Sequence, residues 1–142
     1  HEALDITQET FIAAFSALGR YDHERPFLAW LKHIALNKCR DWARRRKVRA
    51  FFTRAMPLEM AFDVSDDAIP ADVQAVDRAE LARVTAAILR LPSRLREALV
   101  LRTIDGLGQA EAAEVLGVSE KTVETRLYRA RGKLKAMLGD QI

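Results

Sequence analysis

The chain has 142 residues, of which 49% are hydrophobic and 30% charged. A chain of this length forms one typical domain or two small ones, and this composition allows a buried core. No apolar run approaches the roughly 18–20 residues that a membrane span needs. A single cysteine, Cys39, excludes an internal disulfide and a multi-cysteine zinc site. The start at His1 is polar and acidic rather than a signal peptide. We therefore expect a cytoplasmic protein without membrane insertion, and His1 in place of Met suggests a trimmed or fragmentary N-terminus.

The net charge of +3 is unevenly distributed along the chain. Residues 20–54 carry eleven Lys and Arg against three acids, whereas residues 55–90 carry seven acids against three bases. The bases again outnumber the acids over residues 91–142. Two basic blocks around an acidic stretch suggest two modules joined by a linker, with a polyanion as partner. The alternative is a pair of ordinary solvated faces, because a basic pI alone is a weak sign.

The hydrophobic spacing is helical throughout, and no segment alternates as a half-buried strand does. A first apolar-periodic helix ends at Gly19. Residues 19–25 lack this periodicity and are expected to form a loop, and Pro26 suits the first turn of the next helix. That helix is expected to carry one long buried stripe before it reaches a basic run at residues 44–47. The stripe consists of Phe27, Trp30, Leu31, Ile34, Ala35, Cys39 and Trp42.

The acidic stretch 57–76 is expected to be a mostly unstructured tether with at most a turn of helix. A helix from about Leu81 then ends before Pro92. Ser93 can cap the next helix, which is expected to end at Asp105-Gly106. These elements predict an all-α fold class, in which two small helical domains are joined by a flexible acidic linker.

A short helix at residues 109–116, a turn at Gly117-Val118 and a final helix that Ser119 can cap have the layout of a helix-turn-helix. Gly117 supplies the left-handed conformation that a sharp turn requires. The inner face of the final helix is expected to consist of Val123, Leu127, Ala130, Leu134 and Met137.

The outer face of this final helix is polar and basic, since residues 119–135 hold six Lys or Arg and two acids. Such a helix can contact phosphates, while its hydroxyls, acid and arginines can reach base edges in a major groove. This pattern favours duplex DNA as the partner. The alternative is an ordinary helical hairpin with a solvated basic face.

The helix after Pro26 interleaves aromatic and basic side chains. Single-stranded or melted DNA needs rings on which bases stack and cations that hold phosphates. Asn37 could make paired hydrogen bonds to a base, and the loop at residues 21–25 could close a pocket for an extruded base. For Trp30 and Trp42, the alternative is burial in the core.

These stretches resemble bacterial RNA polymerase sigma factors. Residues 4–15, LDITQETFIAAF, resemble region 2.2, and Tyr21-Asp22 with residues 27–37, FLAWLKHIALN, resembles regions 2.3 and 2.4. Residues 91–97, LPSRLRE, with Gly106-Leu107 and residues 116–131 resemble region 4. Both regions with only a short acidic linker are similar to the extracytoplasmic-function group of the sigma-70 family. The resemblance implies region 2 at residues 1–56, a linker at 57–76 and region 4 at 77–142.

The resemblance implies a protein that binds core RNA polymerase, directs it to promoters, helps to melt them and is held by an anti-sigma factor, without a cofactor. It places a core-docking set on the first helix, at Asp5, Gln8, Glu9, Phe11 and Ile12. It places a set for the melted minus-ten element at Tyr21, Asp22, Arg25, Phe27, Asn37, Lys38, Arg40, Arg44, Arg45 and Arg46. It places a set for the double-stranded minus-35 element at Lys121, Thr122, Glu124, Thr125, Arg126, Tyr128 and Arg129.

The sequence departs from the family pattern in a few places. The helix that precedes region 2.2 has no counterpart, so that region 2 is expected to be incomplete. Gly108 stands where a Ser-like cap is usual and Ala112 where a larger aliphatic residue is common, and both loosen the first helix of the helix-turn-helix. Glu124 replaces a frequent basic residue, which favours a contact with a cytosine amino group.

A stand-alone helix-turn-helix repressor or activator, with a sensing or dimerising front module, is the alternative function. Its front helix would not need the aromatic and basic pattern around Asn37, because a repressor does not capture single-stranded DNA. An enzyme is not expected. His23 and His33 lack a second cluster of metal ligands, Cys39 is expected in the core, and there is no Gly-rich phosphate loop.

Overall fold

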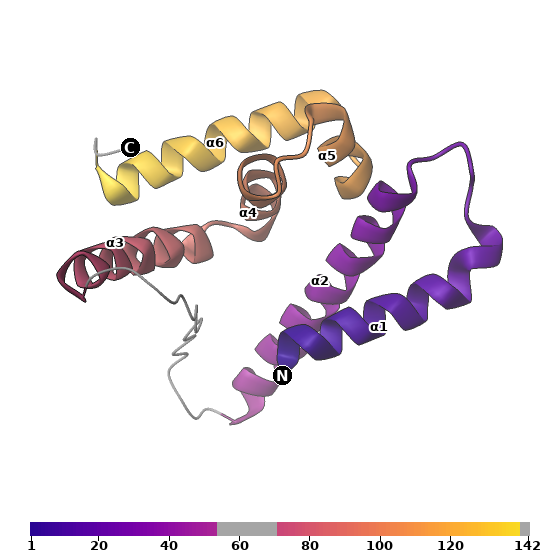
Figure 1. Ribbon diagram of the computed structural model, residues 1–142, viewed down its shortest axis with the longest axis horizontal. Helices are drawn as coiled ribbons and strands as arrows, with labels where there is room; N and C mark the ends of the chain where they lie inside the picture. The colour runs from indigo at the N-terminus through magenta and orange to yellow at the C-terminus, as the bar shows by residue number, and fades with distance from the viewer. Residues whose placement is uncertain (54–70, 140–142) are drawn as a thin grey trace. The chain divides into compact units, whose positions relative to one another are not determined.

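The computed structural model describes residues 1–53 and 71–139, and within these ranges all regular structure is helical (Figure 1). The expected all-α fold class is confirmed. The elements in chain order are α1 (Glu2–Ala17), the 3-10 turn η1 (Leu18–Arg20), α2 (Phe27–Thr53), α3 (Ala71–Arg90), α4 (Ser93–Leu99), the π turn η2 (Val100–Ile104), α5 (Gln109–Leu116) and α6 (Glu120–Leu138).

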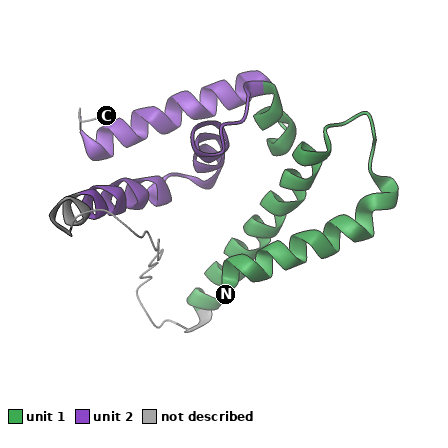
Figure 2. Ribbon diagram, in the orientation of Figure 1, with its two compact units in different colours: residues 1–58, 110–119 green, residues 59–109, 120–142 purple. Residues whose placement is uncertain are grey.

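The chain divides into two compact units, which Figure 2 shows in different colours. Unit 1 contains residues 1–58 and 110–119, and unit 2 contains residues 59–109 and 120–142. Most of α5 therefore belongs to unit 1 together with α1 and α2. The domain boundaries expected from the sequence stay a prediction.

Unit 1 is built on the pair formed by α1 and α2, which lie side by side (Figure 1). Small side chains allow the close approach: Ala14 of α1 and Ala29 of α2 are each only 7% exposed. Thr10 is buried as well, and its hydroxyl donates a 2.7 Å hydrogen bond to the backbone oxygen of Ile6, so that burial leaves no polar group unsatisfied.

The expected buried stripe on α2 is only partly correct. Trp30, Leu31, Ile34, Ala35 and Trp42 are half-buried, whereas Phe27 and Cys39 are exposed. The expectation of a core thiol at Cys39 is therefore wrong. The side of α2 that faces α1 is marked by Lys38, whose ammonium lies 3.8 Å from the Glu9 carboxylate. Cys39 is one residue further, or about 100° around the helix, and is exposed there.

Unit 2 has a core shared by α3, α4 and α6. Its buried members are Ala87, Leu91, Leu99, Leu127, Ala130, Leu134 and Leu138. The inner face expected for the final helix is confirmed at four positions, since Val123, Leu127, Ala130 and Leu134 are buried. It is wrong at its end, because Leu138 is buried and Met137 is 37% exposed.

Two expected helix boundaries differ from the observed ones. Pro92, with an extended ψ of 138°, occupies the N-cap of α4, and its carbonyl accepts hydrogen bonds from the Leu95 and Arg96 amides. Ser93 is thus the first helical residue and not the cap. Residues 71–76, expected in the tether, are helical, because no Pro or Gly interrupts the chain between Ala71 and Arg90. The rest of the expected tether, residues 57–70, lies outside the described residues.

Candidate nucleic-acid interface

The loop before α2 carries a cluster of aromatic rings. Tyr21 lies at its centre, 4.9 Å from the Trp30 ring, 5.4 Å from Phe27 and 5.1 Å from His23, measured between ring centroids. The Tyr21 hydroxyl donates a hydrogen bond to the backbone oxygen of Arg25, which closes the loop on itself. Phe27 remains 49% exposed, so that the cluster still offers an open π face.

Asn37 lies one turn after His33 on α2 and has partners on both atoms of its amide. Its nitrogen lies 3.2 Å from His33 Nε2, and its oxygen accepts a 3.3 Å hydrogen bond from Arg40. His33 Nδ1 in turn lies 2.7 Å from the backbone oxygen of Val115. The amide therefore has two partners within the protein, and the side chain is still exposed.

The basic side chains of α2 form ion pairs with acids of α1 and of α2 itself. Glu9 lies between Lys38, at 3.8 Å, and Arg45, at 4.0 Å, while Arg44 pairs with Asp41 at 2.8 Å. These pairs are largely solvent-exposed, with the Arg44 side chain 74% exposed, so that each contributes little stability. These cations can therefore leave their carboxylate partners and bind phosphate groups at a small cost in free energy.

The core-docking set expected on α1 is exposed at every position: Asp5, Gln8, Glu9, Phe11 and Ile12. Phe11 and Ile12 are 51% and 67% exposed, so that two large apolar side chains lie open on the surface of α1. Glu9 differs from Asp5 and Gln8, because its carboxylate already contacts the Lys38 and Arg45 cations of α2.

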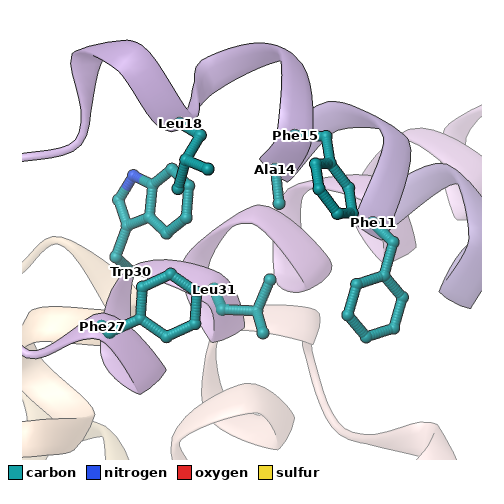
Figure 3. Close-up of a pocket in the computed structure, with 7 residues that line it drawn as sticks. All are labelled: Phe11, Ala14, Phe15, Leu18, Phe27, Trp30 and Leu31. Atoms are coloured by element: carbon teal, nitrogen blue, oxygen red, sulfur yellow. The ribbon is translucent and has the colours of Figure 1, made fainter.

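An apolar groove of about 160 Å³ lies next to this set, between α1 and the start of α2 (Figure 3). It is lined by Phe11, Ala14, Phe15, Leu18, Phe27, Trp30 and Leu31. Every lining residue is hydrophobic, and Phe15 is 76% exposed. Sequence periodicity alone did not distinguish this open face from a core face, because both require the same spacing.

In unit 1, the turn after α5 has the expected geometry. Gly117 has a φ of 67°, in the left-handed region, and the amide of Val118 donates to the backbone oxygen of Ala113. Ala112 is fully buried and Ala113 nearly so.

In unit 2, α6 carries an exposed polar surface beside its buried residues, and four members of the expected polar set lie fully on it. Tyr128 is 78% exposed, and Lys121, Glu124 and Arg129 are exposed as well, whereas Thr122, Thr125 and Arg126 are half-buried. Lys121 and Glu124 form an ion pair of 3.0 Å, and the Thr125 hydroxyl donates to the backbone oxygen of Lys121. Glu124 is therefore partly neutralised by its neighbour.

Three comparisons assign this arrangement to a class of proteins. The family model for sigma-70 region 2 matches residues 1–49, and that for sigma-70, region 4, matches residues 81–134. The RNA polymerase sigma factor CnrH of Cupriavidus metallidurans is 47% identical over 94% of this chain and 72% of its own length. The ECF RNA polymerase sigma factor SigW of Bacillus subtilis is 35% identical over 99% of this chain and 77% of its own length.

A solved structure agrees. The structure of CnrH in complex with the cytosolic domain of CnrY matches with a TM-score of 0.64 and 38% identity, over 97% of this chain and 71% of that chain. The chain therefore belongs to the sigma-70 family of RNA polymerase sigma factors, in its extracytoplasmic-function (ECF) group. None of the described helices is both long and apolar enough to cross a membrane.

Proposed function

We propose that the protein directs core RNA polymerase to a set of promoters, with unit 1 holding the melted minus-ten strand and α6 reading the minus-35 duplex. Two surfaces carry the proposal, both within regions matched by the family models. The first consists of the ring cluster around Tyr21 and the exposed Asn37 amide on α2, and the second is the polar, basic outer face of α6. The protein acts through binding, without catalysing a reaction itself, and works in the cytoplasm.

Aromatic rings, an amide and cations each bind a different part of the melted strand. Phe27 and Tyr21 offer rings on which an extruded base can stack. Asn37 lies about 15 Å further along α2 and offers a donor and an acceptor to the edge of another base of the strand. The cations at Lys38, Arg40, Arg44, Arg45 and Arg46, together with Arg25, hold the phosphates of the strand, with Asp22 shaping the loop through its hydrogen bond to the Glu24 amide.

Core polymerase docks on α1. Its exposed acid and amide at Asp5 and Gln8 suit a basic, polar partner surface, and Phe11 with Ile12 supplies apolar area that would be removed from water. An anti-sigma factor is the proposed regulator, which is supported by the solved complex of CnrH with the cytosolic domain of CnrY.

The experiment is a titration of the purified protein into core RNA polymerase, followed by co-migration and by initiation from a promoter library. Stable co-migration with initiation supports the proposal and identifies the promoter sequence. Duplex binding without association with the polymerase would instead indicate a stand-alone helix-turn-helix regulator.

A further inference from the structure

Residues 110–119, here called the α5 segment, contact the part of unit 1 that is proposed to hold the melted strand. The Arg25 guanidinium forms an ion pair with the Glu114 carboxylate, with Nε 2.5 Å from Oε1. His33 Nδ1 lies 2.7 Å from the backbone oxygen of Val115. A Cβ added to Gly117 would lie 3.9 Å from the His33 ring, so that the turn also lies against α2.

The hydrogen bonds fix where the protons lie. A carbonyl oxygen only accepts, so that His33 Nδ1 must donate to Val115, which leaves Nε2 to pair with the Asn37 amide. Arg40 only donates, which places the Asn37 oxygen toward Arg40 and its nitrogen toward His33. One continuous chain of hydrogen bonds therefore links the α5 segment to the amide proposed to contact a base.

We propose that the α5 segment is an autoinhibitory latch, which occupies Arg25 directly and orders Asn37 through His33 until a promoter strand displaces it. The inference rests on the proposed function, because it concerns the same strand-binding residues. Arg25 donates to Glu114 through Nε and Nη2, so it cannot offer that edge of its guanidinium to a phosphate while the latch is closed.

The ion pair of the latch is suited to reversible opening. The side chains of Arg25 and Glu114 are 53% and 35% exposed, so that water can replace the ion pair at modest cost. Glu114 is also an acid beside a surface proposed for nucleic acid, and it therefore repels a phosphate that approaches Arg25. Both effects favour the closed state without DNA and allow release when a strand supplies its own phosphates.

Glu114→Gln in the full chain tests the latch, because it removes the charge and keeps the shape. We expect this variant, without polymerase, to bind a single-stranded minus-ten oligonucleotide about three- to tenfold more tightly than the parent. Its affinity for a minus-35 duplex should change less than twofold. Glu120→Gln is the matched control, since it removes an equal charge from an exposed residue outside the α5 segment. Equal gains in both variants would overturn the latch.

The His33 ring provides a second readout. The nitrogen-15 signals of His33 in the parent protein should move when the oligonucleotide binds, as Nδ1 loses the Val115 carbonyl. Strand binding with unchanged His33 signals would overturn the proposal. Failure of the proposed function looks different: no initiation with core polymerase from any promoter, whatever the affinities of the Gln variants.

Discussion

Arg129 is an exposed guanidinium on α6, next to Tyr128 and on the face opposite the buried residues. If it contacts a guanine with both of its donors, Arg129→Ala should lower the affinity for the minus-35 duplex by about 1–3 kcal/mol. Arg129→Lys is the control, because it keeps the charge and loses the planar fork. Affinities measured at one salt concentration should fall for both variants, and an unchanged footprint would refute the contact.

Asn37 and Tyr21 are predicted to act on the melted strand rather than on the duplex. Asn37→Ala removes the donor and acceptor offered to a base edge, and Tyr21→Ala removes the centre of the ring cluster. Each should weaken promoter opening by the holoenzyme, measured by permanganate reactivity, more than duplex binding. Tyr21→Phe keeps the rings and serves as control. Equal losses in both assays would count against base capture.

Individual residues show how far sequence reasoning reached. The sequence indicated Asn37 as a side chain able to contact a base, but it did not indicate that His33 and Arg40 are its partners within the protein. The hydrophobic spacing also did not decide whether Met137 or Leu138 is the buried residue. Both lie about 50° from the mean direction of the stripe on α6, so that only the neighbouring helices decide which one is buried.

At the scale of elements, the turn between α5 and α6 depends on a single glycine. Gly117→Ala should destabilise the protein by about 1–2 kcal/mol, because an alanine resists the left-handed φ of 67° although its Cβ would meet only ordinary contact. Gly132→Ala, in the open middle of α6, should stabilise it by about 1 kcal/mol. Urea unfolding measures both, and effects of equal sign would contradict the argument.

The end of α6 offers a matched pair for the core of unit 2. Leu138 is 7% exposed and belongs to that core, so that Leu138→Ala should lower the free energy of unfolding by about 2 kcal/mol or more. Met137→Ala, at the adjacent and more exposed position, should cost less than about 1 kcal/mol. The comparison is made by thermal unfolding, and equal costs would show that the last turn of α6 is frayed.

Local signals predicted some elements better than others. The limits of α5 and the glycine turn follow from chemistry within a few residues, and both were correct. The π turn at Val100–Ile104 was read as the end of an α-helix. The Asp105 amide donates to the backbone oxygen of Val100, and the Arg102 guanidinium donates to the Leu107 carbonyl. Both bonds depend on the path of the loop between η2 and α5, which the helical spacing of the sequence does not indicate.

For the whole molecule, the contacts of the α5 segment could not be read from the sequence. Arg25 and Glu114 are 89 positions apart, and neither lies in a pattern that names the other. The two regions and their order were correct because each carries its own local motif. The roles of the proposed DNA-contacting and docking residues stay predictions, since the structure describes their exposure and neighbours in the protein alone.

Both tryptophans of the chain, Trp30 and Trp42, lie on α2 in unit 1. Tryptophan fluorescence, excited where the tyrosines do not absorb, therefore reports on unit 1 alone, whereas far-ultraviolet circular dichroism reports on helices of both units. If the units unfold independently, the two signals should give transitions that do not coincide in urea. Coincident transitions would show that the protein unfolds as one cooperative body. The placement of two rings thus supplies a built-in optical probe, which needs neither a label nor a substitution.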